Sequence, residues 1–459
     1  MNAFRHWPAW ALGLVLLPLE AQAHAFPERY DLPLPLGLDV AGAGAAVALS
    51  FAVAAASPPG PRPPRELAFR LPPIARRLAA AARSVAVLLL VLLLTAGFLG
   101  SREHWDHNIL PVVVWVWWWV GLAFVCALIG DLWTVIDPWV AVGRWLIGNR
   151  RPPLRLPEGL GVWPAVAGFL VFAWAELVWP ANAMPARLAA AILAYSLLTW
   201  VAMALFGVEA WARRGHVFAL VFGLFGRVAP VTARDGRLVL RPYGAGLQQA
   251  PPAPASLAAL VIVVLATVSF DGVAETMAWL RLEGVAIGWL YGQGVVQRLG
   301  YVGAGALIRT LGLLAAPLAL AAAYLAAAAL SARIDGRPVG ETARRYALSL
   351  VPIAVGYHLA HYFSYLLVQG QAVWPLLSDP LGHGWDLFGT RGQVPDPAAV
   401  DMRLVWFMAV AGIVAGHGLA VVVAHRSAIG RRGQLPIVAL MIAYTMLSLW
   451  IMSQPIAES

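Results

Sequence analysis

Residues 111–130 read PVVVWVWWWVGLAFVCALIG, a run of twenty residues without a charged side chain. A helix needs about 20 mainly apolar residues to cross a bilayer. The rest of the 459-residue chain has the same character, because 61% of its residues are hydrophobic and only 12% are charged. An ordinary soluble domain carries roughly 25% charged residues. So little charge cannot cover a water-facing surface of this size, and the composition therefore predicts an all-α polytopic membrane protein.

Ten apolar segments predict about ten transmembrane helices in one integral membrane domain, residues 24–459. The linker after the first segment, residues 57–73, is rich in Pro and Arg and is typical of irregular structure. A second long connection, residues 369–403, predicts an ordered cap on the outer mouth. The expected spans lie near residues 36–56, 84–99, 111–130, 161–179, 188–206, 256–270, 304–330, 346–368, 405–424 and 437–451.

The N-terminal residues 1–23 have the pattern of a cleavable signal peptide. Arg5 supplies the positive end, a short apolar stretch follows, and Ala21-Gln22-Ala23 matches a small-x-small cleavage site. Cleavage would make His24 the first mature residue, outside a bacterial inner membrane. An uncleaved signal anchor is the alternative.

The arginines predict the orientation of the chain. If the mature N-terminus lies outside, the five inside loops hold 23 arginines and the outside segments hold 7. Positively charged loops stay on the cytoplasmic side, so both ends of the mature chain are expected to be periplasmic. This asymmetry also accounts for the net charge of +9 without a nucleic-acid partner. The only cysteine, Cys126, excludes an intrachain disulfide.

Three histidines in the eighth and ninth spans are the first candidates for chemistry. His358 and His361 are three residues apart and share one helix face. His417 is expected at a similar depth on the antiparallel neighbouring span. Three imidazoles and a water form a known zinc arrangement, so these residues predict a divalent metal site, with zinc favoured over copper. The alternative is that each ring bonds a neighbouring tyrosine or backbone carbonyl.

Two carboxylates near membrane depth, Glu176 and Asp271, are candidates to orient a water or ligate the metal. Arg309 is expected to pair with an acid at this depth. Four residues outside the spans are secondary metal candidates, with a solvated loop as the alternative: His24, His104, Asp106 and His107. The tryptophans of residues 115–119 form either an interfacial and packing cluster or an aromatic wall for a lipophilic ligand.

Four stretches resemble a bacterial family of polytopic inner-membrane proteins labelled fenitrothion hydrolase. They are HAFPERYDLPLP (24–35), LWTVIDPW (132–139), GYHLAHYFSYLLVQGQ (356–371) and PLLSDPLGHGWDLFGT (375–390). Asp137 stands where the family pattern has Asn. The resemblance covers most of the chain and implies a membrane-bound hydrolase of lipophilic aryl organophosphate triesters, for which some members need a second membrane subunit.

The leading hypothesis is therefore a membrane-embedded, metal-assisted hydrolase of organophosphate esters that acts at the outer leaflet. The metal would generate a hydroxide that attacks phosphorus. A metal or proton-coupled transporter is the first alternative, because intramembrane histidines and carboxylates also serve relays. A non-catalytic subunit of a membrane complex is the second. The expected partners are the lipid bilayer, a lipophilic small molecule and a second membrane subunit.

Overall fold

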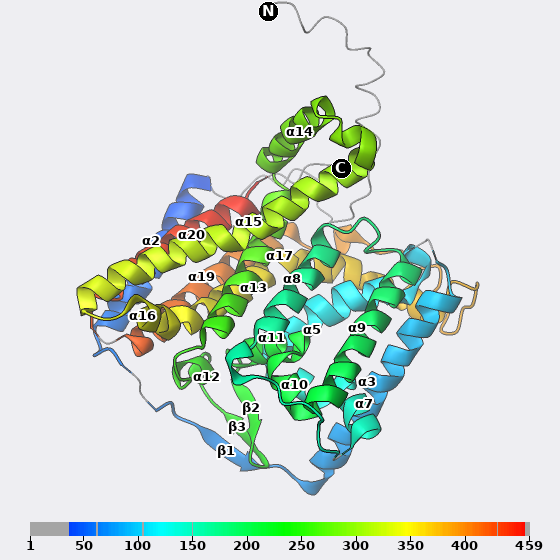
Figure 1. Ribbon diagram of the computed structural model, residues 1–459, viewed down its shortest axis with the longest axis horizontal. Helices are drawn as coiled ribbons and strands as arrows, with labels where there is room; N and C mark the ends of the chain where they lie inside the picture. The colour runs from blue at the N-terminus through cyan, green and yellow to red at the C-terminus, as the bar shows by residue number, and fades with distance from the viewer. Residues whose placement is uncertain (1–35, 61–62, 103–104, 149, 429, 455–459) are drawn as a thin grey trace, which may run out of the picture.

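The computed structural model describes residues 36–60, 63–102, 105–148, 150–428 and 430–454. It is an all-α bundle of long apolar helices, as expected (Figure 1). The expected signal peptide, residues 1–23, and the metal candidates His24 and His104 lie outside the described residues.

Within the described residues, nine helical segments are long and apolar enough to cross a membrane. They match the second to tenth expected spans. The helix at the first expected span, α2 (Leu36–Ala55), is also apolar, but its described apolar part, Ala41–Ala55, is shorter. The nine segments are Pro73–Leu99, Ile109–Leu128, Glu158–Leu177, Pro185–Phe206, Ala255–Ala274, Val295–Asp335, Val339–Ser378, Met402–Ser427 and Leu435–Met452.

Several segments combine consecutive helices. The other helices of the first half are α3 (Pro73–Leu99), η1 (Trp105–His107), α4 (Ile109–Pro111), η2 (Val112–Gly121), α5 (Leu122–Leu128), α6 (Trp133–Ile136), α7 (Pro138–Ile147), η3 (Glu158–Leu160), α8 (Trp163–Leu177), α9 (Pro185–Phe206), α10 (Val208–Arg214), α11 (Val217–Gly226) and α12 (Ala245–Gln248). Those of the second half are α13 (Ala255–Ala274), α14 (Met277–Gly292), α15 (Val295–Asp335), α16 (Val339–Tyr346), η4 (Ala347–Leu350), α17 (Val351–Gln369), η5 (Gly370–Ala372), α18 (Val373–Ser378), η6 (Pro397–Ala399), α19 (Met402–Ser427) and α20 (Leu435–Met452).

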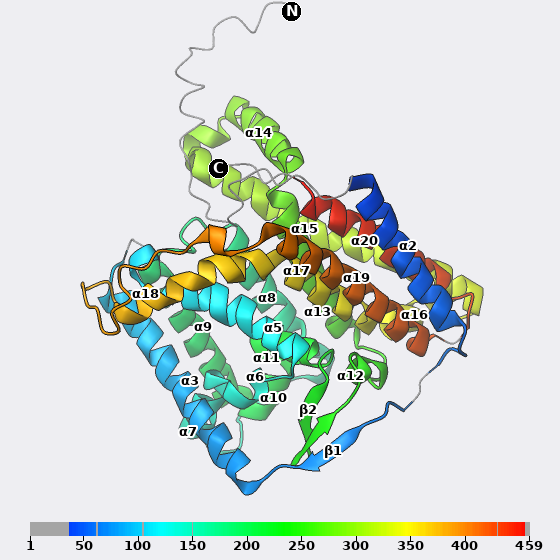
Figure 2. The ribbon, with the colours of Figure 1, turned by 180° about the vertical axis from the view of Figure 1, so that it is seen from behind.

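The helices α13 and α17 form the centre of the bundle. In Figures 1 and 2 they lie between one group containing α2, α15, α19 and α20 and another containing α3, α7 and α9. Two thirds of the apolar window of α13 is buried, against 6% for the equally apolar α3. A helix that is apolar all round and not covered by protein is expected to face lipid, so α3 is the peripheral span.

One connection differs in part from expectation. The linker at residues 57–73 is not wholly irregular, because it contains β1 (Leu67–Arg70). This strand pairs antiparallel with β3 (Arg237–Leu240), which also pairs with β2 (Val231–Arg234). A four-residue strand is too short for its hydrophobic periodicity to be recognised in the sequence, and the strand to which it hydrogen-bonds lies far along the chain. Farther along the chain, α14 follows α13 and projects from the bundle together with the start of α15 (Figure 1).

The third span contains a wide helix, η2, with i→i+5 hydrogen bonding over Val112–Gly121. Its tryptophans take different roles. Trp117 is partly exposed and donates to the carbonyl of Gly370 at 3.2 Å. Trp118 packs edge-on against Phe218, with ring centroids 4.5 Å apart, and Trp119 packs against Phe172 at 4.7 Å. The cluster is therefore mainly internal packing, with Trp119 next to the site described below.

Candidate functional site

A buried acid–histidine contact joins the two central helices. Asp271 lies near the end of α13, and His361 lies in the middle of α17. The Nε2 atom of His361 is 3.0 Å from Oδ2 of Asp271, and both side chains are less than a tenth exposed. A carboxylate and an imidazole in a membrane interior are costly unless they are partnered. Their contact explains how both are accommodated there.

Tyr362 extends this contact to a second carboxylate. Its hydroxyl donates to Oδ2 of Asp271 at 2.6 Å and also lies 3.4 Å from Oε1 of Glu176 on α8. The structure thus brings together the two predicted carboxylates and one predicted histidine. The tyrosine that joins them was not predicted as a site residue, although it lies four residues after His358 and therefore shares its helix face.

A small cavity lies beside Tyr362. Its volume is about 10 Å³, and its lining includes Glu176, Thr267, His358 and Tyr362 among apolar side chains. That volume is close to the minimum for one water molecule. His358 is 3% exposed, and its Nε2 atom has no hydrogen-bond partner among the residues that the structure describes. A buried imidazole nitrogen at a polar, water-sized cavity is a group that can exchange a proton with a water there.

His417 does not join this cluster. Its Nδ1 atom is 2.8 Å from the carbonyl oxygen of Ile413 in its own helix, and its ring packs near Tyr444. Tyr444 in turn contacts Ser269 on α13 at 2.5 Å. The backbone bond of His417 agrees with the alternative that the sequence left open for each histidine.

The donor set does not fit the expected zinc or copper site. Among the described residues, no three His, Cys, Asp or Glu side chains gather closely enough to hold a metal ion. His361 already bonds Asp271 through Nε2, and His417 lies against different neighbours.

Arg309 pairs with Glu283 rather than with one of the acids at the centre of the bundle. Its Nε atom is 3.2 Å from Oε1 of Glu283 on α14, and the indole of Trp279 donates to the other carboxylate oxygen at 3.0 Å. Glu283 is 8% exposed. This ion pair links the projecting α14 to α15. The sequence could not show the pairing, because the bend between α14 and α15 that brings the two helices together is set by tertiary packing.

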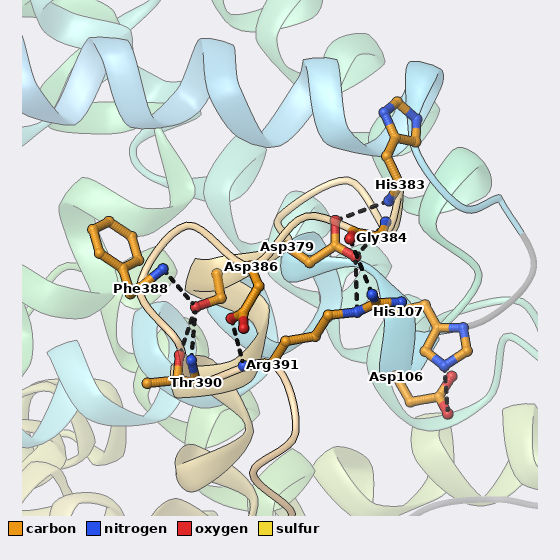
Figure 3. Close-up of polar contacts among 10 residues, drawn as sticks. Asp106, His107, Asp379, His383, Gly384, Asp386, Phe388, Thr390 and Arg391 are labelled. Atoms are coloured by element: carbon orange, nitrogen blue, oxygen red, sulfur yellow. Dashed lines mark hydrogen bonds and ion pairs between the residues drawn. The ribbon is translucent and has the colours of Figure 1, made fainter.

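The segments around residues 105–107 and 378–391 carry a separate, more exposed polar network (Figure 3). Asp106 and His107, two of the secondary metal candidates, lie 3.8 Å apart and are more than half exposed. The expected cap is ordered around Asp379, whose carboxylate accepts from the backbone nitrogens of His383 at 2.8 Å and Gly384 at 2.7 Å (Figure 3). These contacts with backbone groups have the character of loop-stabilising interactions.

A second buried histidine network lies at the opposite end of the bundle and was not predicted. His216 is fully buried, its Nε2 lies 3.0 Å from Oδ2 of Asp137, and its Nδ1 lies 2.6 Å from the hydroxyl of Tyr195. Asp137 also caps α7 by accepting from the nitrogen of Val140. In the sequence, Asp137 stands out only because the family pattern has Asn at this place. The apolar residues that follow His216 in the sequence could have indicated that this histidine is buried.

The fold and the buried polar cluster together define the class: the chain is an all-α polytopic membrane protein with ionisable groups inside its helical bundle. No family model, no curated protein and no solved structure matches it.

Proposed function

We propose that this protein transfers protons through the Asp271 cluster and works as a proton-coupled membrane protein. The observation that carries the proposal is the hydroxyl of Tyr362, which reaches the carboxylates of both Asp271 and Glu176. Buried ionisable groups in a membrane protein commonly belong to relays or transport paths. The imidazole of His361 on the other side of Asp271 lengthens the connected path.

The geometry gives each group a simple task. Two ionised carboxylates close to one phenol repel each other strongly in an apolar interior, so a proton shared in this cluster lowers the energy. The hydroxyl of Tyr362 passes a proton on by donating its own hydrogen to one carboxylate and accepting the hydrogen of the other. A water in the adjacent cavity would continue the path to His358.

The test uses the purified full chain in liposomes with a pH-sensitive dye inside. Under an imposed voltage we expect proton flux above that of empty liposomes. Tyr362→Phe should lower it about tenfold or more, in line with the weight of a positioned proton-transfer group. Tyr324→Phe is the matched control, since the hydroxyl of Tyr324 is also buried but bonds the backbone oxygen of Ala343.

Infrared difference spectra between acidic and alkaline buffer give an independent measurement. A protonated-carboxyl band that titrates in the wild type and changes in Asp271→Asn supports the relay. Flux equal to that of empty liposomes, together with no titrating carboxyl band, would overturn the proposal. Equal flux in the Tyr362→Phe and Tyr324→Phe variants would remove Tyr362 from the path.

Hydrolysis of lipophilic organophosphate esters is the second candidate, on the strength of the resemblance to the fenitrothion hydrolase family. The free Nε2 of His358 beside a water-sized cavity favours it. His358 would accept a proton from the water whose oxygen bonds to phosphorus, while the bond from phosphorus to the aryl oxygen breaks and an aryloxide leaves. Glu176 would orient that water. The cavity has room for about one water, so the bundle would have to open for the ester to enter.

An aryl phosphotriester assay on the purified protein separates the two candidates. Release of aryloxide that is lost in His358→Ala and kept in His417→Ala would favour hydrolysis, because the ring of His417 lies against Ile413 and Tyr444 instead of the cavity. No release by the wild type would rule out hydrolysis by the purified chain, and the flux and infrared measurements then decide on proton transfer.

The location of the protein is proposed from the same chain. The arginine distribution supports a bacterial inner membrane with both ends of the mature chain in the periplasm. A single cysteine placed at Arg431 or Arg432, which are exposed in the connection between α19 and α20, in a Cys126→Ala background, should be labelled by an impermeant reagent only from the cytoplasmic side. Labelling from the periplasm would reverse the orientation.

A further inference from the structure

An arginine-lined pocket lies where α9 ends, at the opposite end of the bundle from Asp271. Its volume is about 180 Å³. It is formed by the connection before α8, the last turn of α9 and the short helix α10. Three of its lining side chains are arginines, namely Arg155, Arg213 and Arg214, and the others are apolar, among them Leu154 and Phe206.

Backbone contacts hold the walls of this pocket in place. The nitrogen of Leu154 donates to the carbonyl of Leu205 at 3.0 Å, which fastens the connection to the end of α9. The guanidinium of Arg214 donates to the carbonyls of Leu156 at 3.3 Å and Pro157 at 3.4 Å. The pocket is therefore a built feature of the fold rather than a gap between mobile loops.

The lining carries a surplus of positive charge. It contains no carboxylate. The neighbouring acid on α10, Glu209, already pairs with Arg144 at 2.7 Å. Guanidinium groups bind phosphate oxygens through paired hydrogen bonds, and basic pockets between membrane helices bind the headgroups of anionic lipids.

The surface that leads to the pocket is apolar. Leu198, Val201 and Leu205 are exposed on the last part of α9 and follow one another at helical spacing. Since α9 is a membrane span, these exposed side chains face the acyl region, and Leu205, the last of them, directly precedes Phe206 of the pocket lining at the end of the span. The arginines of the pocket and the apolar side chains of α9 thus lie next to each other, as do the charged headgroup and the acyl chains of a phospholipid.

We propose that this pocket binds the phosphate headgroup of an anionic phospholipid, with an acyl chain along Leu198, Val201 and Leu205. Arg155 and Arg213 bind the phosphate, and Arg214 both shapes the pocket and adds charge. This site is separate from the proton-transfer cluster, so the inference does not depend on the proposed function.

The experiment measures lipid binding to the delipidated full chain by native mass spectrometry. The titrants are phosphatidylglycerol, phosphatidylcholine and inorganic phosphate. The pocket variant is Arg155→Gln with Arg213→Gln, which leaves the backbone bonds of Arg214 intact. Arg76→Gln with Arg77→Gln is the matched control, because it removes the same charge from exposed positions on α3, outside the pocket.

We expect phosphatidylglycerol to bind more tightly than phosphatidylcholine. Each pocket arginine should contribute about fivefold to that affinity, which corresponds to about 1 kcal/mol per charge. The control variant should bind nearly as the wild type does. Equal loss in the two double variants, or equal binding of the two lipids, would overturn the proposal. If inorganic phosphate alone binds with the same dependence on Arg155 and Arg213 and displaces the lipid, the ligand is free phosphate and the lipid assignment is wrong.

Discussion

The close contact between α17 and α19 makes a sharp prediction, because two glycines of α19, Gly412 and Gly416, have very different surroundings. A Cβ added at Gly416 would lie 2.6 Å from the carbonyl oxygen of Pro352 and 3.0 Å from the Cα of Gly356. Both are backbone atoms, which cannot turn aside as a flexible side chain does. At Gly412 the nearest atom would be the carbonyl oxygen of Gly356 at 3.5 Å, an ordinary van der Waals distance.

The substitution Gly416→Ala therefore has to push the two helices apart by several tenths of an ångström. Overpacking of this kind costs about 1–3 kcal/mol. The change from Gly to Ala in a helix returns about 0.5–1 kcal/mol. Gly412→Ala gains the same helix propensity without the clash, so it should be neutral or slightly stabilising. The two variants should differ by about 2 kcal/mol in free energy of unfolding.

The assay is reversible unfolding of the purified protein in mixed micelles with increasing SDS, followed by circular dichroism. Gly412→Ala serves as the control, since it makes the same chemical change four residues away on the same helix. Equal stability of the two variants would refute the reasoning, because it would mean that α17 and α19 do not approach at the distance on which the prediction rests. The result bears on the site as well, since α17 carries His361.

Two further predictions concern buried polar contacts, both measured by the same SDS titration. Arg309→Met should destabilise the protein by about 1–3 kcal/mol, because it leaves the mostly buried carboxylate of Glu283 without its cation. Adding Glu283→Gln should recover part of the lost stability. A double variant no more stable than Arg309→Met would contradict this account. His216→Phe removes the contacts to both Asp137 and Tyr195 and should lower the free energy of unfolding by about 1–3 kcal/mol. Tyr195→Phe removes one contact and should lower it by about 1 kcal/mol. A larger loss in Tyr195→Phe than in His216→Phe would show that the histidine does not hold this network together.

The sequence predicted many of the residues of the site but not how their side chains are arranged. The spacing of His358 and His361 indicated a shared helix face, and both are buried near the centre of the bundle. Their different roles were not visible. The ring of His361 contacts Asp271, whereas the Nε2 of His358 at the cavity has no hydrogen-bond partner within the described part of the chain. Which neighbour each ring meets depends on the rotation of α17 against helices from other parts of the chain.

The sequence by itself determined the class of protein and, to within several residues at many ends, where the spans lie. The reason is that the bilayer imposes a length and an apolar composition on each helix, and both are local properties of the chain. A search for apolar segments misses helix ends that carry charged residues. Helix α3 begins at Pro73 instead of near residue 84, because its first turns contain arginines.

Only the tertiary structure decided which polar groups meet. Membrane helices associate through shape and through interhelical hydrogen bonds, since apolar side chains gain little by leaving lipid for a protein interior that is equally apolar. The rotation and neighbours of each helix are therefore set by long-range fit, such as the glycine contact between α17 and α19. That fit placed Tyr362 between Asp271 and Glu176, left His417 against its own helix, and joined His216 to Asp137 across a long stretch of the chain.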